Sequence, residues 1–463
     1  MLAQAQQLVS LPGYFGRDLR DPLLRTLGRQ EPRPPEGADA AAWADPATGR
    51  FPLLVFARLG DTARAEAAIA QGADPGRVNE KTGSSPLQLA AQHGHLAVVE
   101  LLLRHGASPT QANSLTGECP LLLAAGNGHS EVAEALLRQR ADPEHVHAAT
   151  GAFPLLAAAM NGHRAAVELL LRHVAEPDRI HEVTAATALS LAAGAGHAGA
   201  VDALLRRGAD PKLINELDGT FPLLLAVAEG HALVAAALLS AAADANDVCV
   251  HNGSFPLLAA AQGGHAEAAE VLLQHAADPN QLQPVSGAFP LLEAATHGRA
   301  EVLRVLLRAR ADPDAVHEET GSFALLQAAV RGPSSTADAL LRQGARSGQA
   351  NRRTGYFPLL LAAERGRLAV VNVLLQHGAD PEQRQKGTGT TPAQAAAAAG
   401  HADVAERLRQ PRPGLPALLL GAGAEPAPAA ASKDCAEVPQ PSPHAPAEGL
   451  FGACWARPAK GRQ

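Results

Sequence analysis

The 463-residue sequence predicts an all-α repeat solenoid, and three observations carry that prediction. A short apolar block returns every 34 residues, eleven times, with no insertion or deletion between copies. Each copy holds two stretches with the apolar spacing of a helix, and a glycine separates them. Both stretches are shorter than the roughly 12–15 residues at which isolated helices become even marginally stable. Each unit must therefore bury its apolar face against its neighbours, as units do in a linear stack.

The first helix of every copy begins in the same register. The starting residues are Pro52, Pro86, Pro120, Pro154, Ala188, Pro222, Pro256, Pro290, Ala324, Pro358 and Pro392. Proline suits the first helical turn because its missing N–H would be unpaired there in any case. An alanine pair inside this helix, such as Ala124–Ala125, predicts close approach of neighbouring first helices.

A glycine stands between the two helices in all eleven copies, from Gly60 to Gly400, and predicts a tight turn without a β-carbon clash. The second helix supplies the bulk of the core, because a leucine recurs in it at one position. These leucines are Leu102, Leu136, Leu170, Leu204, Leu238, Leu272, Leu306, Leu340, Leu374 and Leu408. Gly106 is typical of a left-handed cap at the end of a second helix.

The polar stretch between one unit and the next predicts a projecting, hairpin-like finger. It begins near an Asp-Pro pair such as Asp74–Pro75 and closes with a small polar residue before a glycine, as in Thr82–Gly83. Such pairs fit a turn whose glycine has positive φ. One finger position alternates between asparagine and histidine, for which we expect local hydrogen bonding of the finger. Its members are Asn79, Asn113, Asn215, Asn351, His147, His181 and His317.

The residue before the first helix predicts two kinds of helix start. Ser85 with Gln88, Thr187 with Ser190 and Thr391 with Gln394 have the spacing of a capping box, which satisfies two N–H groups. Six units that begin Phe-Pro-Leu-Leu carry Phe and Leu at these two positions instead, and we expect an apolar contact to replace the cap there. The pairs are Phe51/Leu54, Phe153/Leu156, Phe221/Leu224, Phe255/Leu258, Phe289/Leu292 and Phe357/Leu360.

The segments SPLQLAAQHGHLAVVELLLRHGASP and TPAQAAAAAGHADVAERL resemble ankyrin repeats, and the resemblance covers about residues 48–409. Tetratricopeptide repeats share the 34-residue period, but a polar finger of about a dozen residues in every unit argues against them. The resemblance implies a stack of helix-turn-helix units with hairpin-like fingers. It also implies a protein interaction module without catalytic activity.

The sequence divides into three predicted parts. Residues 1–47 predict a degenerate N-terminal cap and linker, residues 48–409 the repeat array, and residues 410–463 a Pro/Ala-rich disordered tail. The unit from Thr184 loses its turn glycine and helix proline, and the unit from Thr320 carries Pro333 after the inter-helix glycine. We expect local opening or a bend at these two units.

Composition excludes several functions. The net charge of −7 provides no basic stripe, so we expect no nucleic-acid partner. Four scattered cysteines favour a reducing compartment. Neither a secretory signal nor an apolar run of the roughly 20 residues that a membrane helix needs is present. We therefore expect a monomer in the cytoplasm or nucleus, without membrane insertion.

The histidines and cysteines predict no catalytic or metal site. Seven of the nineteen histidines follow the inter-helix glycine: His95, His129, His163, His197, His231, His265 and His401. Stacked helices lie roughly 8–10 Å apart, whereas zinc needs its ligands within about 2.0–2.3 Å. We expect these histidines to pack and hydrogen bond at the start of the second helix. Cys119 and Cys249 occupy structural positions, and we expect no cofactor and no enzyme activity.

The candidate binding residues are those that vary where the framework repeats. In ankyrin-like stacks the end of the first helix and the finger tips face the concave groove, where we expect one or more proteins or peptides to bind. The candidates are Gln92, His93, Asn127, Met160, Asn161, Glu229, Thr296, His297, Glu318, Glu319, Arg331, Arg352, Arg353, Glu364 and Arg365. The alternative is a substrate-recruiting adaptor or regulatory subunit of a ubiquitin or proteasome complex, although no ligase-binding box is recognisable.

Overall fold

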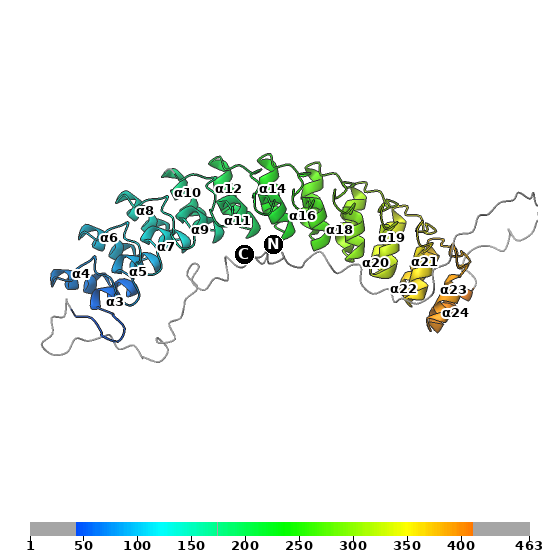
Figure 1. Ribbon diagram of the computed structural model, residues 1–463, viewed down its shortest axis with the longest axis horizontal. Coiled ribbons are helices and arrows are strands. Elements are labelled where there is room, and N and C mark those ends of the chain that lie inside the picture. The colour runs from blue at the N-terminus through cyan, green and yellow to red at the C-terminus, as the bar shows by residue number, and fades with distance from the viewer. Residues whose placement is uncertain (1–42, 174, 411–463) are drawn as a thin grey trace, which may run out of the picture. The chain divides into compact units, whose positions relative to one another are not determined.

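The computed structural model describes residues 43–173 and 175–410. This part of the chain forms eleven helix pairs that follow one another in a single row (Figure 1). The predicted N-terminal cap, with Leu23, Leu24 and Leu27, falls almost entirely outside the described residues, as does the Pro/Ala-rich tail after Gln410. These two predictions stay predictions, whereas the all-α repeat solenoid is confirmed.

The first helices begin at the predicted residues. They are α3 (Pro52–Leu59), α5 (Pro86–Gln92), α7 (Pro120–Gly126), α9 (Pro154–Met160), α11 (Ala188–Gly194), α13 (Pro222–Ala228), α15 (Pro256–Gly263), α17 (Pro290–Thr296), α19 (Ala324–Val330), α21 (Pro358–Glu364) and α23 (Pro392–Ala398). Each packs against the first helices of the preceding and following units. Figure 1 shows α3 to α11 on one side of the row and their second helices on the other.

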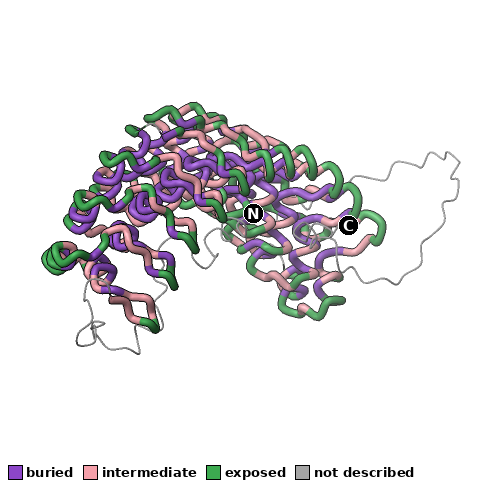
Figure 2. Tube along the Cα trace, turned by 60° about the vertical axis from the view of Figure 1, so that its left-hand side comes forward, coloured by how far each residue is buried: buried purple, intermediate pink, exposed green. Residues whose placement is uncertain are grey.

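The second helices are nearly uniform in length. They are α4 (Thr62–Ala70), α6 (Leu96–Arg104), α8 (Ser130–Arg138), α10 (Arg164–Arg172), α12 (Ala198–Arg206), α14 (Ala232–Ser240), α16 (Ala266–Gln274), α18 (Ala300–Arg308), α20 (Ser334–Arg342), α22 (Leu368–Gln376) and α24 (Ala402–Arg409). The predicted leucine row is buried in all ten units, and the alanine pairs are fully buried. Figure 2 shows buried residues through the middle of the stack and exposed residues at the connections.

The two predicted kinds of helix start are both confirmed. Ser85, Thr187 and Thr391 form complete capping boxes. The phenylalanines that replace them are buried and make no side-chain cap, as at Phe255. Cys119 takes the same place, and its Sγ accepts a hydrogen bond from the N–H of Leu122 at 3.3 Å. Burial raises the pKa of the Cys119 thiol to about 11, so this cysteine stays protonated at neutral pH.

The fingers have the predicted turn. In the first of them, the N–H of Gly83 donates to the carbonyl of Asn79, and the N–H of Asn79 donates to Ser84. Gly83 has φ +70°, the left-handed conformation that its sequence position predicts. In the unit that lacks this glycine, Ala185 adopts φ +53° instead. A residue other than glycine in this conformation is strained by about 1–2 kcal/mol. The lower stability predicted for that unit is therefore expected at Ala185.

Candidate functional site

The predicted positions at the ends of the first helices are all partly or fully solvent-accessible. They are the last helical residue and the residue after it, as Glu364 and Arg365 are in α21. The exposed members are His93, His297, Arg331 and Arg365. The half-buried members are Gln92, Asn127, Met160, Asn161, Glu229, Thr296 and Glu364. The side chains presented at this repeated place therefore vary along the array, although Asn, His and Arg each occur there more than once.

Several of these side chains are occupied by the fold itself. Asn161 Nδ2 donates to the carbonyl of Gly126 in the preceding unit at 2.7 Å, so it joins two units. Asn127 Nδ2 and Thr296 Oγ1 each donate at 2.8 Å to a carbonyl of their own helix. His297 Nδ1 lies 3.0 Å from the carbonyl of Glu293. A structural role accounts for these four residues as well as a binding role does.

The predicted finger residues lie on two successive fingers. Glu318, Glu319, Arg352 and Arg353 are all exposed. Arg353 Nη2 donates to the carbonyl of Glu318 at 3.3 Å, and Arg346 Nε lies 2.7 Å from Asp314 Oδ2. The acidic finger and the basic finger therefore touch, and the change of charge along the row is abrupt.

Five of the seven histidines after the inter-helix glycine link their unit to the preceding one. The imidazole Nε2 lies 2.9 to 3.1 Å from a carbonyl at the end of the preceding first helix. The pairs are His95–Arg58, His129–Gln92, His163–Gly126, His197–Met160 and His265–Ala228. Because a carbonyl only accepts, Nε2 carries the proton. We call this contact the histidine staple; it satisfies a carbonyl that a helix end leaves unpaired.

The staple confirms the structural role predicted for these histidines. The structure adds that the hydrogen bond runs to the preceding unit. Arginine makes the same contact in two units where histidine is missing. Arg299 Nε donates to the carbonyl of Gln262 at 3.3 Å, and the guanidinium of Arg367 donates to Val330 and Gly332 at 2.7 and 2.6 Å. Within residues 43–173 and 175–410, no group of three His, Cys, Asp or Glu side chains could hold a metal ion.

A second link joins consecutive fingers. The side chain at the position shared by Asn79 and His181 donates to a carbonyl of the preceding finger at 2.7 to 3.5 Å. The pairs are Asn79–Thr48, Asn113–Thr82, His181–Thr150, Asn215–Thr184, Cys249–Asp218, Gln283–Asn252, Asn351–Thr320 and Gln385–Thr354. The sequence predicted hydrogen bonding within each finger; the structure shows that the bonds also run between fingers.

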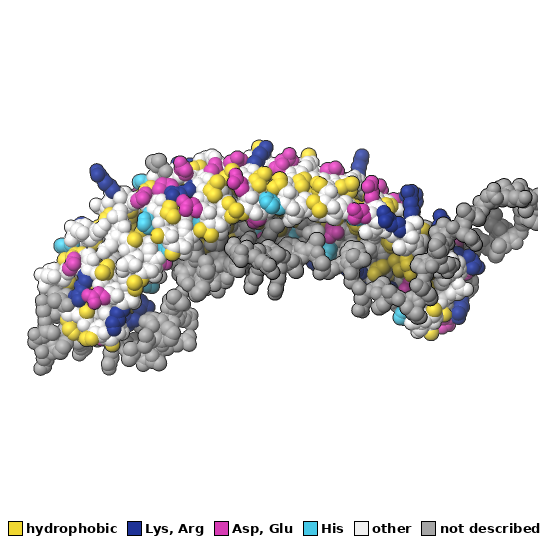
Figure 3. Space-filling model, viewed as in Figure 1, with side chains coloured by type: hydrophobic (Ala, Val, Ile, Leu, Met, Phe, Trp, Pro, Cys, Tyr) yellow, Lys and Arg dark blue, Asp and Glu magenta, His cyan; other side chains and the backbone are white. Residues whose placement is uncertain are grey.

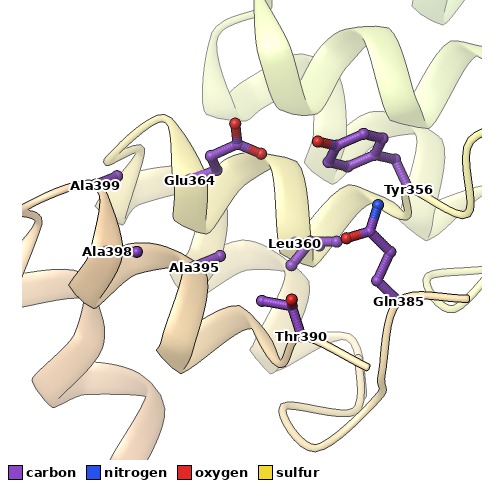
Figure 4. Close-up of a pocket in the computed structure, with 8 residues that line it drawn as sticks. All are labelled: Tyr356, Leu360, Glu364, Gln385, Thr390, Ala395, Ala398 and Ala399. Atoms are coloured by element: carbon purple, nitrogen blue, oxygen red, sulfur yellow. The ribbon is translucent and has the colours of Figure 1, made fainter. Parts of the chain in front are cut away.

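A hollow of about 370 Å³ lies between the last two units (Figure 4). Its lining residues are Tyr356, Leu360, Glu364, Gln385, Thr390, Ala395, Ala398 and Ala399. At the end of α23, Ala398 and Ala399 stand where the end of α21 carries Glu364 and Arg365, so the side of the hollow formed by the last unit has only short side chains there. Glu364 is the only predicted binding residue that lines it.

Sequence reasoning missed a set of exposed apolar side chains on the fingers. Five of them at the tips form what we call the apolar fingertip row: Leu115, Val183, Leu217, Val250 and Val285, each 62 to 73% exposed. Four more, which we call the stem row, precede the tips: Ile180, Ile214, Leu282 and Val316. Figure 3 shows hydrophobic side chains at the surface along the middle of the array. Eight of these nine residues keep a 34-residue register, and Val250 lies one residue before it, but an apolar residue in register is equally typical of a core.

A family model for ankyrin repeats (three copies) matches seven overlapping segments. The segments are residues 36–113, 53–147, 121–215, 155–249, 223–317, 291–385 and 325–414. Together they span residues 36–414, which is more than half of the chain. The chain belongs to the ankyrin repeat family. Ankyrin repeats are protein–protein interaction modules, so the coarse prediction of a protein-binding scaffold is confirmed.

Among solved structures, the human ASB11 ankyrin repeat domain is similar to this chain. The two are 26% identical over an alignment that covers 50% of this chain and 100% of that chain, with a TM-score of 0.44. No curated protein matches this ankyrin repeat chain. Among the described residues of the ankyrin array, no helix is both long enough and apolar enough to cross a membrane.

Proposed function

We propose that this ankyrin repeat protein is a non-enzymatic scaffold that binds proteins or peptides along the face formed by its first-helix ends and fingers. In the ankyrin fold this is the concave face. Binding would occur as a monomer and without nucleic acid. The proposal rests on the contrast between links that recur in most units and neighbouring side chains that vary along the array.

The observation that supports this proposal is a set of charged side chains in the last units that make no hydrogen bond or ion pair within the part of the chain that the structure describes. Among the described residues, no hydrogen bond or ion pair involves the side chains of Arg331, Glu364 or Arg365. All three occupy the variable position at the end of a first helix, where histidine staples and finger links leave the surface uncovered. Charged side chains that are exposed or half-buried and that the fold does not use are available to a partner, for which they can provide orientation and specificity.

The hollow beside Glu364 is a second observation that favours binding at this face. Its volume lies within the range of about 300–1,000 Å³ in which ligand sites of proteins fall. Leu360, Ala395 and Ala398 give it an apolar lining, while the Glu364 carboxylate and the Tyr356 ring stand at its edge (Figure 4). Such a site suits an apolar side chain of a partner whose neighbouring residue is cationic.

Site-specific photo-crosslinking tests the proposal. A photoreactive amino acid replaces Arg331 or Arg365 in the full chain, and the matched control carries it in place of Glu270, an exposed residue of the second helix α16. We expect protein adducts from the two first-helix positions and few from the control. Equal yields from all three positions would show that the first-helix face has no special role.

The identities of the adducts decide between the scaffold and the adaptor alternative. Ligase or proteasome subunits crosslinked to the array would favour an adaptor of a ubiquitin or proteasome complex. Client proteins without such subunits would favour a general scaffold. Analytical ultracentrifugation of the same samples measures whether the chain is a monomer.

A further inference from the structure

The apolar fingertip row is too exposed to belong to the core. Its members are 62 to 73% exposed, and the stem row adds side chains that are 42 to 54% exposed. Leaving this many large aliphatic side chains in water forgoes roughly 25 cal/mol for each Å² of apolar surface that burial would remove. A concentration of such residues along one element is typical of an interaction surface.

Neighbouring members of the row lie close together because consecutive fingers are packed. A Cβ placed at Gly219 would lie 3.1 Å from Cγ2 of Val250, and one placed at Gly253 would lie 3.2 Å from Cγ2 of Val285. The Val250 and Val285 side chains therefore rest on the glycine turn of the finger before each of them. The links between fingers, such as Gln283 to Asn252 at 2.7 Å, hold this arrangement.

The charges beside the apolar row are acidic over the central fingers. Glu182 and Glu216 directly precede Val183 and Leu217. Glu318 occupies the same place in its finger as Glu182 and Glu216, and Glu319 replaces the apolar fingertip residue there. All four are exposed, and among the described residues none of their carboxylates is in an ion pair. A partner that covers the row must place cationic side chains next to its apolar ones.

The spacing of the fingers distinguishes a helical partner from an extended one. Stacked units repeat at roughly 8–10 Å. An α-helix presents one face every seven residues, which is a rise of about 10.5 Å. An extended strand returns a side chain to the same face about every 6.6 or 13 Å, because its side chains alternate. The helix matches the finger repeat and the strand does not.

We propose that the apolar fingertip row binds a cationic amphipathic helix of a partner protein, with one apolar residue every seven positions and Lys or Arg beside it. This inference rests on the proposed function, since it names the partner class for the finger part of the same surface. The stem row extends the contact towards α17 and α19. The basic fingers after Arg352 limit it at that end.

Selection from a peptide library tests the inference. Random peptides of about 28 residues, or four heptads, are displayed and selected on the immobilised full chain. We expect the selected peptides to place apolar residues at intervals of seven, with Lys or Arg beside them, and to be helical when bound. Another pattern, such as alternation of apolar and polar residues, would overturn the inference, and so would the absence of selected peptides.

Three variants of the full chain locate the binding. The finger variant carries Val183→Asn, Leu217→Asn, Val250→Asn and Val285→Asn, and its matched control carries Leu233→Asn, since Leu233 is 79% exposed on the second helix α14. The third variant carries Glu364→Ala and Arg365→Ala. We expect the finger variant to bind the selected peptides on the order of 100-fold more weakly, while the control binds as the unsubstituted chain does.

The binding of the selected peptides to these variants distinguishes the helix-binding inference from the proposed scaffold function. Peptides that bind the finger variant normally but lose affinity for the Glu364/Arg365 variant would leave the proposed function standing and overturn the helix-binding inference. Vesicle flotation and sedimentation of the finger variant complete the test. A vesicle-bound or dimeric chain that is released by the finger substitutions would assign the row to a membrane or a second copy, and the inference would fall.

Discussion

Two turns of each unit share a left-handed backbone but differ in what surrounds them. The turn between the helices has φ of +66° to +83° at nine of its glycines, and in most units a Cβ there would meet the next unit's histidine at 2.5 or 2.6 Å. The turn at the end of the second helix has φ +89° at Gly106, with nothing within 4 Å. Glycine is kept throughout the crowded turn, whereas Arg140, Ala242, Ala276 and Arg310 replace it in the open one. Both turns have a positive φ in most units, but only the turn that contacts the next unit is glycine throughout. Crowding by the next unit, more than the positive φ, therefore decides which positions require glycine.

The largest effect should come from adding a methyl group to the crowded turn. Gly128→Ala combines the left-handed strain at φ +77° with a clash against His163, and we expect a loss of about 3 kcal/mol. The matched change Gly106→Ala adds only the strain, or about 1–2 kcal/mol. Urea unfolding measures both, and hydrogen exchange of α7 to α10 shows where the loss lies. Equal losses would mean that the staple does not constrain the turn.

A double-mutant cycle isolates the clash. His163→Ala removes the hydrogen bond to Gly126 and should cost about 1 kcal/mol. Combined with Gly128→Ala, it also removes the atom that the new methyl group meets. We therefore expect the double variant to lose less than the sum of the single losses, by about 1 kcal/mol or more. Additive losses in the urea titrations would contradict the contact between ring and turn.

Glycine should increase stability when it replaces alanine in the turn at the end of the second helix. Ala242→Gly and Ala276→Gly relieve φ values of +70° and +63°. Each should stabilise its unit by about 0.5–1 kcal/mol, because the relief of strain exceeds the added entropy of the unfolded chain. The control Ala236→Gly, inside α14, should cost about 1 kcal/mol. A loss of thermal stability in the first two variants would show that alanine is unstrained at this turn.

The smallest effect should be a dependence of stability on pH at one staple. Burial lowers the pKa of His163; the hydrogen bond to Gly126 opposes this, and His129 and His197 lower the pKa further. The unfolded chain, with a histidine pKa near 6.5, therefore takes up a proton first as the pH falls. The stability that the neutral ring provides is complete above about pH 6.5 and is lost as the pH falls towards the lower folded pKa.

The measurement compares urea midpoints at about pH 7.5 and 5.5 in the unsubstituted chain and in His163→Gln. Glutamine has the size and the N–H donor for the Gly126 carbonyl but does not titrate in this range. We expect the unsubstituted chain to lose more stability on acidification than the variant. An identical change in both chains would show that the ring does not report on pH.

The regular part of the fold could be predicted from the sequence because it depends on residues within one unit. The starts at Pro86 and its equivalents, the leucine row and the capping box of Ser85 and Gln88 are all local patterns, and all are confirmed. The partners of the histidines could not be predicted. His95 donates to a carbonyl 37 residues earlier, and only the stacking distance brings that carbonyl into reach.

The candidate surface was predicted in part. Glu364 and Arg365 vary from unit to unit, which marks them as candidates without a structure. The apolar fingertip row was missed because Val285 and a buried valine have the same chemistry and the same period. The difference between them is exposure, and exposure depends on how far the finger extends beyond the stack.

Two links recur along the array, and each reaches back a fixed number of positions along the chain: 37 for the histidine staple and 31 for the finger link. Duplicating or deleting any block of one period leaves both offsets intact, because each donor still meets an acceptor of the same kind. The array can therefore change in length by whole layers without new contacts having to arise. Lengthening by one period adds one layer of roughly 8–10 Å to the stack, so the length of this array changes in whole steps of one unit.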